Sequence, residues 1–189
     1  MCFYPPCTSH CPLGCGLYPL FTTHHPLPCV TLLCVSASDE LFMEEALREA
    51  QRALALGEVP VGAVVIRDGD IIGRGCNRPI TSKDPTAHAE ILALREAGQA
   101  IGKYRLLDCD IYVTVEPCAM CAGAITHARI RRLIYGAEDP KAGAVHSVLQ
   151  VLNNARMNHR VEVMFGVLAA KSMELLQRFF RDKRATQRT

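Results

Sequence analysis

Two short motifs constrain the fold of this chain most strongly, because their side chains gain a chemical role only if they meet. The first is His88-Ala89-Glu90 and the second is Pro117-Cys118-Ala119-Met120-Cys121. Two cysteines three positions apart at the start of a helix point their sulfur atoms the same way, and Pro117 suits the first helical position. The partial positive charge at a helix N-terminus favours thiolate over thiol. The spacing therefore predicts a helix start that offers two thiolates to a cation.

The cation that suits this donor set is Zn²⁺, with His88 as the third ligand. Three protein ligands leave the fourth tetrahedral position open, which is typical of a catalytic zinc ion whose bound water has a pKa of about 7. Glu90 stands two residues beyond a ligand, where it can move the proton of that water. A structural zinc site would need a fourth Cys or His at a paired spacing. We therefore interpret His88, Cys118 and Cys121 as zinc ligands and Glu90 as the catalytic proton carrier.

Several classes of protein share parts of this pattern. A C-x-x-C pair alone is also typical of redox proteins, and metal content near one zinc per chain would exclude that reading. A zinc-stabilised RNA-binding module would have no need of the carboxylate of Glu90. H-x-E followed by P-C-x-x-C is the known signature of zinc-dependent deaminases that act on nucleobases. We therefore predict a deaminase, with a free nucleobase or nucleotide enzyme acting on guanine or cytosine as the alternative.

Length and composition indicate one globular domain. The chain has 189 residues, of which 49% are hydrophobic and 21% are charged, as in soluble globular proteins. Its net charge of +2 gives no indication of a nucleic-acid partner. Of its ten cysteines, only four follow residue 38. This usage is that of a cytoplasmic domain with two ligands and two buried thiols, Cys76 and Cys109.

Residues 1–38 differ from the rest because they contain no Asp, Glu, Lys or Arg and are rich in Pro, Cys and His. We expect a disordered or non-native extension that precedes a deaminase domain at residues 39–189. One alternative is a targeting segment cleaved near Val35-Ser36-Ala37, although no positive region precedes it. Another is a metal site formed by His10, His24, His25 and the cysteines of this segment. Prolines interrupt the apolar run well below the ~20 residues of a membrane span, so no membrane partner is expected.

The remaining chain alternates helical and strand patterns. Ser38 or Asp39 is expected to cap the first helix, and Asp68-Gly69 is a strong hairpin signal. The expected helices span residues 39–56, 87–97, 116–127, 144–153 and 169–183, and the expected strands span residues 62–67, 70–76, 110–115, 130–136 and 160–165. This order predicts a mixed five-stranded sheet with helices on both faces and ligands at the carboxyl ends of strands.

Longer stretches identify a family. They are Glu58–Ala63, Asn77-Arg78-Pro79, Asp84–Glu90, Tyr104-Arg105-Leu106, Glu116–Ile125, Tyr135-Gly136, Asn158-His159-Arg160 and Phe179-Phe180. From about Asp39 to Arg184 the chain resembles the bacterial tRNA-specific adenosine deaminases, within the cytidine and deoxycytidylate deaminase superfamily. The resemblance implies a three-layer α/β/α cytidine-deaminase-like sandwich, a homodimer, and conversion of adenosine to inosine at the wobble position of an arginine tRNA. The partner would be the anticodon stem-loop.

The resemblance also implies roles for residues around the proposed zinc site. Asn77 matches a position that hydrogen-bonds the flipped nucleotide, Val59 and Glu116 line the pocket, Asp139 and Lys141 lie near the RNA, and Phe179, Phe180 and Arg181 shape anticodon binding. From the residues alone, Asn77 is by default a turn residue and the basic terminal helix is by default a solvated face. We expect one of the two phenylalanines to be core. The chain departs from the family at Lys103 and at His146, where Asn and Gly are usual.

Overall fold

The computed structural model describes residues 35–152, 154 and 156–186. The predicted disordered or non-native extension therefore lies outside the described residues except for residues 35–38. Helix α1 (Ala37–Ala55) starts earlier than predicted, because Ser36 is its cap. The Ser36 side chain accepts a hydrogen bond from the backbone N–H of Asp39, and the Asp39 carboxylate accepts one from the N–H of Ser36 at 3.0 Å. This reciprocal capping box makes Ser36 part of the folded domain.

A mixed sheet of five strands forms the middle of the described residues, as predicted. The strands are β1 (Gly62–Arg67), β2 (Asp70–Cys76), β3 (Asp110–Val115), β4 (Arg132–Ala137) and β5 (Glu162–Phe165), in the order β2-β1-β3-β4-β5. Strand β1 pairs antiparallel with β2 and β3, whereas β3, β4 and β5 are parallel. The end of β2, the start of β1 and the carboxyl ends of β3 and β4 consequently lie at one end of the sheet.

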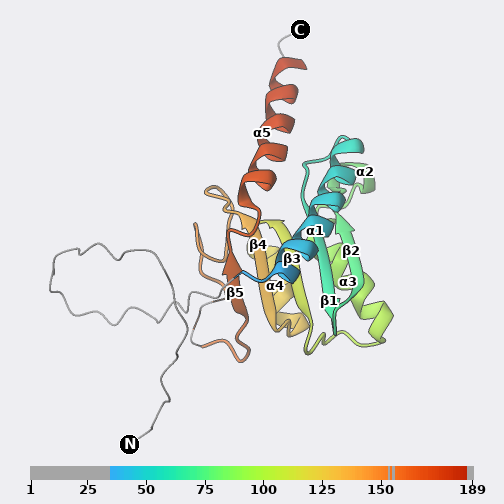
Figure 1. The fold of residues 1–189 in the computed structure, drawn as a ribbon, viewed down its shortest axis with the longest axis vertical. Helices are drawn as coiled ribbons and strands as arrows, with labels where there is room; N and C mark the ends of the chain where they lie inside the picture. Colours follow the sequence, from blue (N-terminus) through green and yellow to red (C-terminus); the bar gives the residue numbers. More distant parts are fainter. Residues whose placement is uncertain (1–34, 153, 155, 187–189) are drawn as a thin grey trace, which may run out of the picture. The chain divides into compact units, whose positions relative to one another are not determined.

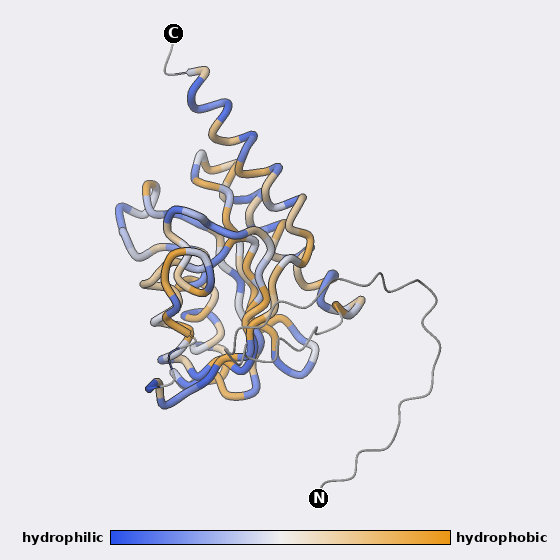
Figure 2. The backbone as a smooth tube through the Cα atoms, turned by 90° about the vertical axis from the view of Figure 1, so that its left-hand side faces the viewer, coloured by the Kyte–Doolittle hydropathy of each residue, from blue (hydrophilic) through white to orange (hydrophobic). Residues whose placement is uncertain are grey.

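Helices cover both faces of this sheet (Figure 1). Helices α1 and α5 (Ala169–Thr186) lie on one face, and α3 (Ala89–Ile101) and α4 (Ala119–Ala128) lie on the other. Strand β3 is buried at every position, which is typical of a strand covered on both sides. Figure 2 shows the strands as a largely apolar band between the helices. The three-layer α/β/α sandwich is thus confirmed. Among the described helices, none is both long and apolar enough to span a bilayer.

Two glycines set how closely the helices approach the sheet. A Cβ atom on Gly62 would lie 2.1 Å from the backbone oxygen of Ala46 in α1, and one on Gly75 would lie 2.0 Å from the backbone oxygen of Ala89 in α3. Real Cβ atoms do not reach such distances, so any side chain here would push the helices away. Gly75 therefore fixes the height of the α3 N-terminus, beside His88, above strand β2.

Three further local predictions were wrong. The predicted helix 144–153 is a run of turns over its described part, residues 144–152. Residues 77–85, for which no element is predicted between the expected strand 70–76 and helix 87–97, contain the short helix α2 (Pro79–Ser82). Cys118, not Glu116 or Pro117, is the cap of α4, so Pro117 precedes the helix. In the first case the backbone N–H groups of residues 145–147 donate to the carboxylate of Glu116.

Candidate active site

Two metal-ligand candidates occupy equivalent positions at two helix starts. His88 is the N-cap residue of α3 and Cys118 is the N-cap residue of α4, both with extended backbone. Cys121 follows at the third position of α4. The Nδ1 atom of His88 lies 3.8 Å from the Cys118 sulfur and 3.7 Å from the Cys121 sulfur. Three donor atoms from two segments about 30 residues apart therefore converge within 4.8 Å of one another.

Asn77 holds the histidine end of this group in place. Its side-chain oxygen accepts a hydrogen bond of 3.0 Å from the backbone N–H of Ala89, the first residue of α3. Asn77 is itself buried and follows the end of β2, and its own N–H donates to the backbone oxygen of Val61 at 3.0 Å. The carboxamide thus satisfies one of the N–H groups that a helix start leaves unpaired. This contact ties the position of His88 to the sheet.

The donor group fits a tetrahedral metal. Nitrogen and sulfur donors bound at about 2.0 and 2.3 Å with tetrahedral angles lie about 3.6 Å apart, close to the observed 3.7 and 3.8 Å. A hydrogen bond from the Cys121 thiol, and then one from His88, lower the pKa of Cys118 to about 3. The bond to Cys118 and burial raise the pKa of Cys121. Without a metal ion, the two cysteines therefore carry a single negative charge. A bound divalent cation would favour deprotonation of the second thiol, and coordination requires both thiolates.

Glu90 adds a buried carboxylate beside these donors. The residue is 3% exposed, and its Oε2 atom has no hydrogen-bond partner among the described residues. Burial raises the pKa of Glu90, while the charge of His88 and a hydrogen bond with Cys121 oppose that rise. Buried polar atoms without partners are rare in folded proteins. Such an oxygen, next to three metal donors, is suited to exchanging a proton with a bound molecule.

A cleft of about 660 Å³ lies at the same end of the sheet as the donor group. Its wall includes Val115, the last residue of β3, and five residues that the resemblance assigned to substrate binding. These five are Val59, Asp139, Lys141, Phe180 and Arg181. They come from the segment before β1, the segment after β4 and helix α5. The structure therefore brings together side chains that no local pattern connects, and Arg184 of the basic terminal helix joins them.

The two phenylalanines of α5 differ in exposure, as expected. Phe179 is 7% exposed, and Phe180 is 45% exposed and lines the cleft. Their rings meet edge to face at 5.3 Å, and the ammonium group of Lys183 lies 5.5 Å from the Phe179 ring centre. Phe179 consequently anchors the helix, and Phe180 is the ring available to a ligand.

Glu116, which the resemblance places among the pocket-lining residues, is not among the residues that line this cleft. The residue is 3% exposed, and the segment 139–147 surrounds its carboxylate with N–H and hydroxyl donors. Burial alone would raise the pKa of Glu116, but these hydrogen bonds outweigh burial and bring the pKa to about 2. The sequence signals only an acidic residue before Pro117, so this role could not be read from it.

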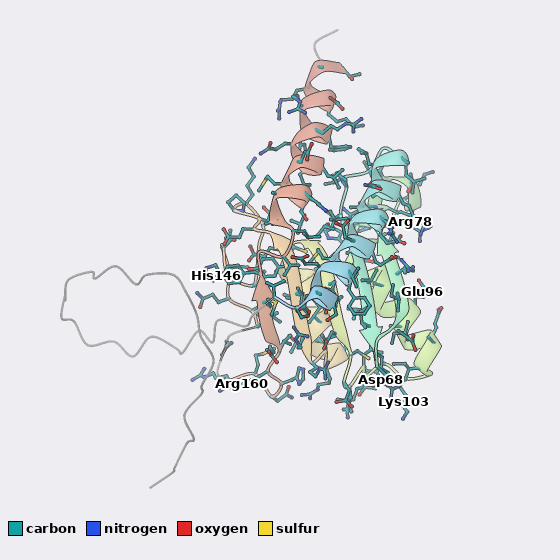
Figure 3. All side chains as sticks on the ribbon, in the orientation of Figure 1. Asp68, Arg78, Glu96, Lys103, His146 and Arg160 are labelled. Atoms are coloured by element: carbon teal, nitrogen blue, oxygen red, sulfur yellow. The ribbon has the colours of Figure 1, made fainter. Side chains whose placement is uncertain are left out.

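His146 lies apart from the donor group. Its ring stacks on Phe165 with centroids 5.5 Å apart and an interplanar angle of 18°. Figure 3 places His146 on the β5 side of the sheet and Arg78 on the opposite side, near the β2 edge. The replacement of the usual glycine at this position therefore adds an exposed aromatic contact at the sheet edge.

The donor group and its carboxylate, set at the carboxyl end of β3 in this sandwich, define a deaminase. The family model of MafB19-like deaminases matches residues 37–184. A tRNA-specific adenosine deaminase of Haemophilus influenzae is 51% identical over 150 residues, covering 79% of this chain and 87% of the relative.

Two solved structures place the chain more finely. One, from a study of A-to-I editing by tRNA deaminases at the wobble position of transfer RNA, is 49% identical with a TM-score of 0.70, covering 72% of this chain and 99% of the other. The second, a guanine deaminase from Nitrosomonas europaea, is 25% identical with a TM-score of 0.65, covering 84% and 96%. This chain belongs to the tRNA-specific adenosine deaminases, which confirms the predicted family and enzyme class.

Proposed function

We propose that this chain converts adenosine to inosine at the wobble position of a tRNA anticodon by zinc-dependent hydrolysis. One observation carries the proposal: three metal donors converge beside a buried, unpartnered carboxylate oxygen in a chain of this family. An arginine tRNA is the expected substrate from the resemblance. The cytoplasm, where tRNA is used, is the compartment that this substrate implies.

His88, Cys118 and Cys121 would hold the zinc ion. Two sulfur donors and one imidazole nitrogen are a preferred donor set for zinc, and the interatomic distances support a tetrahedral arrangement. When bound, zinc supplies Lewis acidity that makes water a nucleophile near neutral pH. Because three protein donors are present in the described residues, the fourth position would stay open to the reaction.

Glu90 would carry the protons of the reaction. Its buried Oε2 atom takes a proton from the attacking water as the water oxygen bonds to C6 of adenine, and delivers it to ring nitrogen N1. A second proton passes through the same oxygen to the exocyclic amine, the C6–N bond breaks, and ammonia leaves. The product is inosine. Such general acid–base assistance contributes roughly 10²- to 10⁴-fold to a rate.

The cleft beside the site supports an RNA substrate. A target base must leave its stack to reach buried chemistry, and an anticodon loop allows this at low cost. The amide oxygen of Asn77 is engaged by Ala89, so its amide nitrogen is the group that would donate to the flipped nucleotide. The exposed ring of Phe180 would stack on a base. Arg181 and Lys141, which line the cleft, would contact phosphates. Asp139 and Val59 would form the adjacent part of the cleft wall.

A second copy of the chain would cover helix α4. This helix carries no charged residue, whereas a helix facing water usually has a polar outer face. Its outer side shows Met120, Gly123, Ala124 and His127, and an apolar groove of about 620 Å³ runs between it and α3. An isologous dimer pairs such a surface with itself. This supports the homodimer that the resemblance implies.

The test is an assay of four substrates with one enzyme preparation. The zinc-loaded chain is incubated with an anticodon stem-loop carrying adenosine at the wobble position, with free adenosine, with guanine and with cytosine, and products are quantified by mass spectrometry. We expect inosine in the stem-loop and much slower turnover of the small molecules. Faster deamination of guanine or cytosine than of the stem-loop would overturn the proposal in favour of a nucleobase deaminase.

A further inference from the structure

Segment 139–147 is tied to the strand end that carries the metal-ligand candidates. The Oε1 atom of Glu116 accepts hydrogen bonds from three consecutive backbone N–H groups, of Val145 at 3.0 Å, His146 at 2.7 Å and Ser147 at 2.9 Å. The Oε2 atom accepts from the N–H of Asp139 at 3.1 Å and from the Ser147 hydroxyl. One carboxylate thus holds the first residue and the last three residues of the segment.

The same segment also pairs with the backbone beside the ligand position. The N–H of Ala144 donates to the carbonyl oxygen of Pro117 at 2.9 Å, and Gly143 forms an antiparallel bridge with Cys118. The approach requires a glycine: a Cβ atom on Gly143 would lie 2.3 Å from Oε2 of Glu116 and 2.6 Å from the backbone oxygen of Asp139. The segment is therefore held in place by the Glu116 carboxylate and by the backbone of Pro117 and Cys118.

The seated segment forms part of the cleft. Its first residues, Asp139 to Lys141, line the cleft together with Phe180 and Arg181 of α5. A carboxylate has about four lone-pair sites, and Glu116 already accepts five hydrogen bonds. It has no capacity left for a substrate, so its influence on the reaction must pass through the segment.

We propose that Glu116 is a positioning residue for RNA binding: its carboxylate sets segment 139–147 in the conformation that shapes the cleft wall. The inference rests on the proposed function, because the cleft must receive RNA. Charged hydrogen bonds are stronger than neutral ones, so this clamp keeps the wall formed before the substrate arrives. The reacting atoms are reached by other side chains, and loss of the clamp therefore weakens substrate binding more than it slows the chemical step.

The primary test is Glu116→Gln. An amide NH₂ group, which is a donor, then replaces one carboxylate oxygen and meets N–H donors of the segment that it cannot accept from. We expect KM for the anticodon stem-loop to rise at least ~10-fold while kcat stays within ~2-fold, the pattern of lost binding. Zinc content should stay at the wild-type value. The amides of residues 145–147 should exchange with deuterium faster. Asp68→Asn is the matched control, because Asp68 is 83% exposed at its side chain and lies at the far end of the sheet in Figure 3.

Two further variants keep the proposal testable if Glu116→Gln fails to fold. Ser147→Ala removes one donor to the carboxylate, and Gly143→Ala places a Cβ atom against that carboxylate and so displaces the segment while residue 116 stays a glutamate. Both should raise KM in the same sense, and neither should add its full effect to that of Glu116→Gln.

Unchanged KM in the folded variants, a fall in kcat at constant KM, or unchanged exchange of the 145–147 amides would overturn the inference. A wild-type enzyme that does not deaminate the stem-loop would instead count against the proposed function. Amide exchange in Glu116→Gln would then decide for or against the clamp by itself.

Discussion

Replacing the buried carboxylate Glu90 with an amide separates its catalytic role from its effect on stability. Glu90→Gln keeps the shape of the side chain but cannot accept and return a proton at Oε2, so kcat should fall by roughly 10²- to 10⁴-fold. The wild-type oxygen is buried without a partner among the described residues, and an unpartnered buried polar atom costs about 1–3 kcal/mol. Removing the charge relieves part of that cost, so the variant should melt no lower than wild type and up to about 4 °C higher.

The assay combines three measurements on the zinc-loaded proteins. Single-turnover deamination of the stem-loop gives the rate, calorimetry gives the melting temperature, and elemental analysis gives zinc per chain, which should not change. Glu96→Gln is the control, because Glu96 lies on the same helix, is exposed, and accepts a hydrogen bond from the N–H of Arg74 at 3.1 Å. A Glu90→Gln enzyme with more than a tenth of the wild-type rate would refute the assignment. Loss of zinc would show instead that Glu90 is a ligand.

Three other outcomes can be checked on stability and assembly. Burial alone would raise the pKa of Asp39, but hydrogen bonds from Ser36 and Tyr112 and the charge of Arg132 lower it. The stabilisation is therefore complete above the unfolded pKa of about 3.9 and is lost as pH falls through the lower folded value. Asp39→Asn should accordingly lose about 1 kcal/mol of unfolding free energy at pH 7 and little at pH 2 in urea titrations, and an equal loss at both would contradict this. A strong chelator should lower the melting temperature of wild type, by the equivalent of about 2.7 kcal/mol if zinc had been present at 100 times its Kd, but not that of Cys118→Ser. Ala124→Arg should halve the mass measured by light scattering, and a dimer of unchanged mass would place the interface elsewhere.

The predictions that succeeded used residues close together in sequence. Asp68-Gly69 predicts the β1–β2 hairpin, and both residues have positive φ in the structure. Residues 110–115 are predicted as a strand, and β3 spans Asp110–Val115. The cysteine spacing and the His-x-Glu motif predict the donor set, and its three donor atoms do converge. Hairpin, strand and ligand chemistry are properties of a few neighbouring residues, so sequence alone suffices.

The predictions that failed concerned contacts between distant segments. Apolar residues at positions 144, 145 and 152 have helical spacing and are buried, but the segment is not helical, and its first N–H groups donate to Glu116, about 30 residues earlier. The cap of α1 lies at Ser36 because Asp39 also meets Tyr112 and Arg132.

The sequence by itself determined the chemistry of the site, the order of most elements and the family. The tertiary structure decided which backbone groups donate hydrogen bonds to the Glu116 carboxylate, which side chains line the cleft, and which phenylalanine of α5 is exposed. The chemistry of a side chain follows from its residue type, which the sequence gives directly. The contacts of that side chain depend on packing, because strand pairing and helix packing bring together groups whose separation along the chain has no regular period.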